Sequence, residues 1–456
     1  MFLFLVIYIS LFMFSFYFIF NNKVEHIIYF LIFGLPIYIT TLSVSHLYDL
    51  NFLIPFLQFT KEIIIIFALI ILLIKNKNNI VLNNLDKLLI LYLILVILYI
   101  FLPIGNTGLY QRLVATKTIA FFPLVYFVGK FLDPNSLNIE KTFKLISLFG
   151  ILVACILISE LLFYQNLQTL TGYADFMFNI FNQDTSGNYG LTWTFETDNG
   201  IKRFASIYSM PLEHAAATLI TVSAILSLIL VQNNRIQLTK FLTISLIASI
   251  LSILFAVSRA SFLGYILILY AFMLISKNKQ FKFVIKYGLF FAFFIVIFLI
   301  KDDIKNLFLG TIFFTNSSSL THLIAWTEAI FTIYNNPMGI GLGSIGILAN
   351  KENSFFAGEN QLLIIGVQVG VIPMIIYLLM YFKILKIAYL SFNNFDGKIR
   401  KTALFIFLVK IGLIVPLLTS EIESYIYISY IVWFISGYLI NILSTTDGME
   451  LKIIHD

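Results

Sequence analysis

The sequence predicts an all-α polytopic membrane protein with about 12–14 transmembrane helices and two long extracytoplasmic loops. Three observations support this prediction. Hydrophobic residues make up 60% of the 456 residues, and the mean hydropathy is +0.96. Charged residues make up only 11%, and most of them lie in short basic breaks between apolar runs.

The apolar runs have the length of membrane-spanning helices. A bilayer core roughly 30 Å thick needs about 20 apolar residues per helix. Helices are expected because lipid cannot satisfy backbone polar groups, and the runs do not alternate as β-barrel strands do. The expected spans are residues 2–20, 27–44, 52–74, 86–103, 113–131, 143–164, 211–231, 239–257, 260–276, 283–300, 360–386, 402–418 and 424–442.

The distribution of basic residues predicts the orientation. Nineteen lysines and arginines lie in one set of alternate loops and eight in the other set. The positive-inside rule assigns the first set to the cytoplasm. With thirteen spans the C-terminus is then inside and the N-terminus outside. Because no basic residue precedes the first run, we interpret it as a retained helix rather than a signal peptide.

Composition also limits the classes of function. The net charge of +6 follows the loops between spans, so it indicates a membrane protein and not a nucleic-acid-binding one. Cys155 is the only cysteine, so an intrachain disulfide or a cysteine metal cluster is impossible. We expect one integral membrane domain over residues 1–456, with no metal and no cofactor.

Two outer loops are long enough to have structure or a function of their own, at residues 165–210 and 301–358. In the second, Ser317–Ser319 provides N-caps for an amphipathic helix that Asn335-Asn336-Pro337 ends. The string MGIGLGSIG that follows matches the G-x-G-x-x-G nucleotide fingerprint. It lacks a βαβ context and faces outward, so we interpret it as a tight turn.

Arginines and acids at the edges of these loops are the candidates for chemistry. Arg259 begins a span and is able to hold a lipid diphosphate bidentately; the alternative is an arginine that marks the interface. Arg203 is a second candidate for such a clamp, or else a solvated loop residue. Glu359, where the chain re-enters the membrane, is a candidate general base, or else an acid that favours the helix dipole.

Other polar residues are weaker candidates. Glu213-His214 is a candidate acid–base pair or an interfacial cap, and His322 is a donor or a structural residue. Trp193 and Trp326 have the chemistry to stack on sugars. Lys410, in mid-span, needs a partner, and Lys61-Glu62 is expected to pair locally. We expect Glu421 and Glu423 to be solvated caps of the last outer loop.

Three segments together resemble the oligosaccharide-polymerase and O-antigen-ligase superfamily of bacterial envelopes. They are RFASIYSMPLEHAAATL at Arg203–Leu219, SRASFLGYIL at Ser258–Leu267, and the stretch His322–Pro373 with its Trp, its Asn-Pro-x-Gly-x-Gly turn and its re-entry helix. The resemblance covers about the second half of the chain. Ligases of this superfamily carry His-Asn at the re-entry point, whereas this chain has Glu359-Asn360, so the polymerase branch fits better. His322 stands where the family often has an arginine.

The resemblance implies a polymerase in the bacterial cytoplasmic membrane. It joins undecaprenyl-diphosphate-linked repeat units into O-antigen, capsule or exopolysaccharide at the outer leaflet, and a chain-length regulator is a possible partner. Arg259, Arg203 and Glu359 would be catalytic. His322, Glu213, His214, Trp326 and Asn360 would bind substrate. The alternatives are a ligase that transfers the glycan to a lipid or protein, and a transporter of lipid-linked sugars.

Overall fold

The computed structural model describes the whole chain except residues 78–79, 232–234, 277–316, 347–359 and 446–456. Over the described residues it is all-α, with no strands beyond two isolated β-bridges. Ten of the described helical segments are long and apolar enough to cross a membrane, and a bent helix pair makes an eleventh candidate. The prediction of a polytopic all-α membrane protein is therefore confirmed.

The spans follow the apolar runs of the sequence. The one at Val24–Leu47 consists of short helical pieces that end in α3. The others are α1 (Leu3–Phe20), α4 (Ile54–Lys75), α5 (Asn84–Phe101), α8 (Ile139–Phe163), α11 (Pro211–Ile229), α13 (Arg259–Ser276), α18 (Val371–Asn394), α19 (Gly397–Thr419) and α20 (Ile426–Ser444).

The predicted spans differ from the structure in three places. The run at 113–131 is two helices, α6 (Leu109–Ala120) and α7 (Phe122–Phe131), which meet at 46° next to Pro123. The run at 239–257 is α12 (Lys240–Phe255), which is shorter than the other spans. The run at 360–386 is interrupted at Gly370, which separates α17 (Gln361–Val369) from α18. Residues 283–300 lie outside the described residues.

Helices α11 and α20 lie at the centre of the bundle, where nearly all their residues are buried, whereas α1 and α4 each have one exposed apolar face. Glycines bring α20 onto α7, because a Cβ on Gly437 would overlap the carbonyl oxygen of Tyr126 and one on Gly129 would overlap that of Phe434. Such contacts are usual between membrane helices, since small residues let the backbones approach closely.

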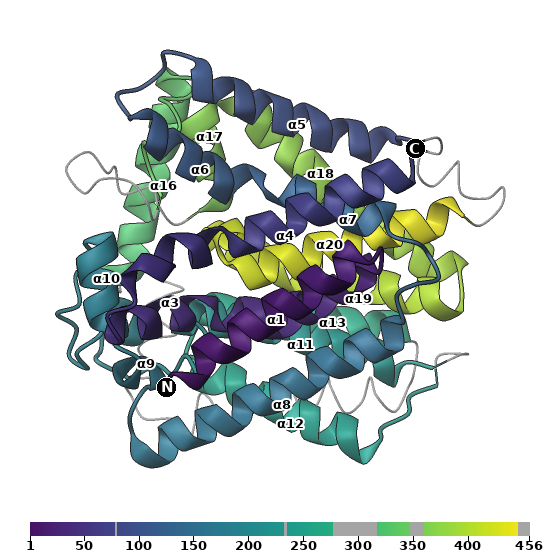
Figure 1. The fold of residues 1–456 in the computed structure, drawn as a ribbon, viewed down its shortest axis with the longest axis horizontal. Helices are drawn as coiled ribbons and strands as arrows, with labels where there is room; N and C mark the ends of the chain where they lie inside the picture. The colour runs from purple at the N-terminus through teal and green to yellow at the C-terminus, as the bar shows by residue number, and fades with distance from the viewer. Residues whose placement is uncertain (78–79, 232–234, 277–316, 347–359, 446–456) are drawn as a thin grey trace.

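The basic loops meet at one end of the bundle. There Lys398 Nζ donates to the Pro134 carbonyl (2.5 Å), Asn76 donates to the Phe131 carbonyl (2.8 Å) and Lys401 pairs with Glu140. The described parts of the two long loops occupy the opposite end, at the left of Figure 1, where α9 (Leu167–Leu170), α10 (Tyr173–Phe181) and α16 (Ser317–Asn335) lie. The fold thus separates the basic loops from the long loops.

The glycine-rich string after α16 forms a tight turn, as the sequence predicts. Gly339, Gly341, Gly343 and Gly346 all have positive φ. The turn packs on the end of α17 (Gln361–Val369), with Ile340 N–H donating to the Val367 carbonyl (2.8 Å). A Cβ on Gly341 would overlap the Ile104 carbonyl oxygen, so the glycine is needed for a close backbone approach.

Candidate functional site

The first candidate site is an arginine pair, Arg203 and Arg259, at the loop end of the bundle. Arg203 ends a short turn in which its N–H donates to the Phe195 carbonyl (2.8 Å) and its Nη1 to the Thr194 carbonyl (3.4 Å). Arg259 is the first residue of α13, and its Nη1 donates to Ser319 Oγ on α16 (3.4 Å). The pair therefore joins the first long loop, a span and the helix of the second long loop.

The two guanidinium groups lie close enough to repel each other. Burial, and after it the positive charge of Arg259, lower the pKa of Arg203 to about 10, although the negative charge of Asp198 opposes both effects. Arg203 therefore remains charged at neutral pH. Its Nε is buried and has no hydrogen-bond partner among the described residues. An anion bound between the arginines would reduce the repulsion between their positive charges. It would also accept a hydrogen bond from Arg203 Nε.

The two sequence-predicted residues of α16 lie one helical turn apart. The rings of His322 and Trp326 have centroids 6.5 Å apart. The indole Nε1 of Trp326 is buried and has no partner within the described part of the chain. Because Ser319 on the same helix contacts Arg259, the structure brings this helix next to the arginine pair. The substrate-binding roles of His322 and Trp326 stay predictions.

Glu213 and His214, adjacent in sequence, occupy different environments. His214 is fully buried; its Nδ1 lies 3.0 Å from the Phe204 carbonyl oxygen and its ring stacks on Tyr208 with centroids 5.6 Å apart. Glu213 points into a cavity, and its Oε2 accepts from the N–H (3.2 Å) and Oγ (2.5 Å) of Ser209. The structure thus separates the predicted acid–base pair, with Glu213 in the cavity wall and His214 in the core.

The re-entry point is described only in part. Glu359 lies outside the described residues, so its role stays a prediction. Asn360 is the N-cap of α17: its Oδ1 accepts from the N–H groups of Leu362 (3.0 Å) and Leu363 (3.2 Å). This capping role is what the structure shows for Asn360, and contact with substrate remains to be tested.

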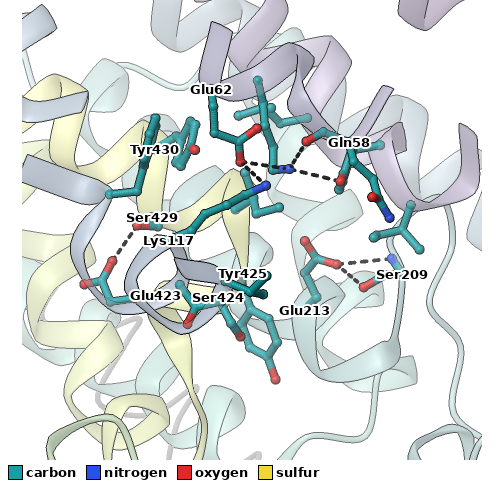
Figure 2. A pocket seen from close by; sticks show the side chains of 18 of the residues that line it. Gln58, Glu62, Lys117, Ser209, Glu213, Glu423, Ser424, Tyr425, Ser429 and Tyr430 are labelled. Carbon is teal, nitrogen blue, oxygen red and sulfur yellow. Dashed lines mark hydrogen bonds and ion pairs between the residues drawn. The ribbon is translucent and has the colours of Figure 1, made fainter. Parts of the chain in front are cut away.

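A cavity of about 430 Å³ lies at the same end of the bundle and is the second candidate site. It is lined by α3, α4, α6, α10, the segment before α11, and the short helix Ile422–Ser424 with the start of α20. Three carboxylates from distant parts of the sequence surround it, those of Glu62, Glu213 and Glu423 (Figure 2). Its volume is within the range of small-molecule pockets, roughly 300–1,000 Å³.

Glu62 is the centre of a charge cluster in this cavity. Its Oε1 lies 3.1 Å from Lys61 Nζ and 2.8 Å from Lys117 Nζ. Lys61 Nζ also donates to Tyr38 Oη (2.9 Å) and to the Gln58 carbonyl (2.8 Å). The predicted pairing of Lys61 with Glu62 is confirmed. The contribution of Lys117 was not predicted, because no sequence pattern relates residues so far apart in the chain.

Glu423 was predicted to be solvated, and this prediction is wrong. Its side chain is buried and accepts from Tyr377 Oη (2.6 Å), Ser429 Oγ (2.5 Å) and Trp433 Nε1 (3.0 and 3.1 Å). Glu421 is also buried. The helices around the loop between α19 and α20 bury both residues, which the position of the loop in the sequence does not show.

Lys410 is stabilised within the bundle mainly by aromatic rings. Its Nζ lies 4.0 Å from the ring centroid of Trp433 and 4.4 Å from that of Tyr381. Trp433 in turn donates to Glu423. The partners of Lys410, which the sequence could not identify, are therefore the rings of Trp433 and Tyr381, and Glu423 accepts a hydrogen bond from Trp433.

No protein-family model and no curated protein matches this chain. Among the described residues, no group of three or more His, Cys, Asp and Glu side chains is placed to hold a metal ion. The chain is a multi-pass membrane protein with two candidate sites at the end that carries its long loops.

Proposed function

We propose that this protein polymerises undecaprenyl-diphosphate-linked oligosaccharide repeat units into a surface polysaccharide at the outer leaflet of the bacterial cytoplasmic membrane. The observation that carries the proposal is the arginine pair. The positive charge of Arg259 acts unfavourably on Arg203, whereas the carboxylate of Asp198 stabilises both arginines. Arg203 Nε still has no hydrogen-bond partner among the described residues, so it offers a donor to an anion. A diphosphate at the membrane surface is an anion of suitable charge, and guanidinium groups bind phosphate oxygens bidentately.

The proposed reaction is an inverting glycosyl transfer. The hydroxyl oxygen of an acceptor unit attacks the anomeric carbon of the donor glycan, and the bond from that carbon to the diphosphate oxygen breaks. Arg203 and Arg259 stabilise the charge that develops on the departing undecaprenyl diphosphate, as preorganised cations do. The hydroxyl proton passes to Glu359, the proposed general base. The activated bond is already present in the carrier, so the proposal involves no nucleotide.

The resemblance of the sequence to the polymerase branch provides the second line of support. The segments that carry it contain Arg203, Arg259 and His322. All three lie at the loop end of the structure, on the first long loop, α13 and α16. Residues from three separate segments of the sequence thus lie at one end of the bundle.

The substitution Arg259→Lys tests the proposal in cells. Lysine keeps the positive charge but loses the bidentate geometry, so polymer formation should slow roughly 100- to 1,000-fold while the protein is made normally. Arg235→Lys is the matched control, because Arg235 is exposed near the start of α12 at the opposite end. Polymer of full chain length and normal amount from Arg259→Lys would contradict the clamp role.

A further inference from the structure

The charge balance of the cavity differs from that of the arginine pair. Its described lining includes three carboxylates, those of Glu62, Glu213 and Glu423, and two ammonium groups, those of Lys61 and Lys117. The carboxylates therefore outnumber the ammonium groups. Such a site disfavours a diphosphate and suits a ligand rich in hydroxyl groups, which donate hydrogen bonds to carboxylates.

The three carboxylates are not equivalent. Glu62 pairs with two lysines through Oε1, and its Oε2 is fully buried without a hydrogen bond within the described residues. Glu423 accepts from three side-chain donors. Glu213 is bonded by Ser209 through Oε2 alone, and its Oε1 has no hydrogen bond within the described part of the chain. Glu213 therefore offers an acceptor atom to a ligand in the cavity. Lys117, whose side chain is 31% exposed, offers donors beside it.

The walls between these polar groups are aromatic. Tyr38, Phe121, Tyr173, Tyr425 and Tyr430 all line the cavity. Flat apolar ring faces together with a few charged hydrogen-bonding groups match the two surfaces of a sugar ring, its apolar C–H face and its hydroxyl edge.

The rim of the cavity is shared with the lipid-facing surface. Phe59 on α4 is 54% exposed, and Tyr110 and Leu113 on α6 are 76% and 50% exposed. Phe59 belongs to a stripe of exposed apolar residues on α4, such as Phe56, Ile63 and Ile66. A spanning helix presents such a stripe to lipid. The cavity is therefore open toward the bilayer between α4 and α6.

One segment of chain connects the cavity with the arginine pair. It runs from Arg203 to His214, and the contact of His214 Nδ1 with the Phe204 carbonyl fixes its two ends together. Glu213 on this segment lines the cavity, whereas Arg203 faces Arg259. A single amphiphile is thus able to contact both sites through different chemical groups.

We infer that the cavity is a saccharide subsite, which takes the glycan of a lipid-linked substrate that enters from the bilayer between α4 and α6, apart from the arginine pair that takes the diphosphate. The identity of the lipid-linked substrate rests on the proposed function. Glu213 accepts hydrogen bonds from sugar hydroxyls, Lys117 donates to them, and the aromatic walls pack on the rings.

Cysteine protection tests this inference without any turnover. In a Cys155→Ser background, Thr118→Cys places a thiol in the cavity wall, and Thr116→Cys places one on the same helix outside it. The probes are the undecaprenyl-diphosphate-linked glycan extracted from the producing membrane and undecaprenyl diphosphate alone. At about ten times Kd, the glycan should slow maleimide labelling of Thr118→Cys roughly tenfold, because only the unliganded fraction reacts.

The controls separate the possible outcomes. Thr116→Cys should be unaffected, and undecaprenyl diphosphate alone should not protect Thr118→Cys. Adding Glu213→Gln should raise the glycan concentration needed for protection about tenfold or more. Equal protection by the glycan-free lipid, or no protection by either probe, overturns the inference. Protection without polymerase activity would support the saccharide subsite and contradict the proposed function. Polymerase activity without protection would support the proposed function and contradict the subsite.

Discussion

Lys202 and Arg203, which are neighbours in the first long loop, make different contacts. Lys202 Nζ donates to the Tyr164 carbonyl (2.6 Å) and lies 4.5 Å from the Tyr164 ring centroid and 4.9 Å from that of Tyr189. Arg203 instead lies within reach of the charge of Arg259. The sequence presents Lys202 and Arg203 as one basic dipeptide, but in the structure the lysine contacts its own loop, whereas the arginine belongs to the pair that we propose binds an anion.

The charge cluster around Glu62 gives a prediction about stability. Glu62→Gln removes the carboxylate and leaves the ammonium of Lys61, which is 3% exposed, buried beside Lys117. Breaking a buried ion pair from one side costs about 3–5 kcal/mol. We expect a clear loss of thermal stability in detergent, measured by the melting transition of the purified protein.

The double variant Lys61→Met with Glu62→Gln is the control for this prediction. It removes both buried charges and should recover most of the lost stability, because an apolar replacement of a buried pair is often neutral. If Glu62→Gln melts at the wild-type temperature, the cluster does not stabilise the fold.

At the scale of helices, the closest contact is that between α7 and α20. Gly437→Ala would place a methyl group on the Tyr126 carbonyl, so the helices would have to separate. We expect a loss of about 1–3 kcal/mol in the free energy of unfolding, seen as a lower melting temperature. Gly108→Ala is the matched control, because a Cβ there meets nothing within 4 Å. Equal melting of the two variants would contradict the packing account.

Two substitutions at the N-cap of α17 distinguish a capping role of Asn360 from contact with substrate. Asn360→Ala should cost about 1 kcal/mol by removing the cap, whereas Asn360→Ser should keep the cap and the stability. If Asn360 serves only as a cap, Asn360→Ser should also keep normal polymerase activity. Normal melting with lost activity in that variant would instead show that the amide contacts substrate.

Across these elements, the sequence predicted the spans better than their contacts. Continuous apolar runs locate spans because the bilayer requires them, and twelve of the thirteen expected runs coincide with described helices. The bend between α6 and α7 and the burial of Glu423 escaped prediction. At the bend, Phe122 stacks on Trp433 (ring centroids 4.3 Å apart), a contact between residues distant in the sequence.

The two candidate sites likewise differ in how far the sequence could predict them. Both arginines of the pair were candidates from the sequence, Arg259 because charge at a membrane surface stands out from its surroundings and Arg203 through the family resemblance. The cavity was not predicted, except for Glu213. Its other charged members, Lys61 and Glu62 on α4, Lys117 on α6 and Glu423 just before α20, come from three separate parts of the fold, and only the tertiary structure brings them together.

For the whole molecule, the separation of the basic loops from the long loops predicts the orientation. In a Cys155→Ser background, Ser186→Cys in the first long loop should react with an impermeant maleimide added to intact cells. Asn135→Cys, at the basic end, should react only after the membrane is permeabilised. Both residues lie in exposed loops, so accessibility to reagent is matched. The reverse pattern would put the arginine pair on the cytoplasmic side and contradict the proposed function.

The most direct test of the central claim is a polymer ladder from the purified protein. The protein in detergent receives an undecaprenyl-diphosphate-linked repeat unit, with no second acceptor and no nucleotide, beside the Arg259→Lys and Glu359→Gln variants. We predict a ladder from the wild type that both variants lose. A ladder from Glu359→Gln would keep the polymerase and move the general base elsewhere. No ladder from the wild type on a matched repeat unit would contradict the account.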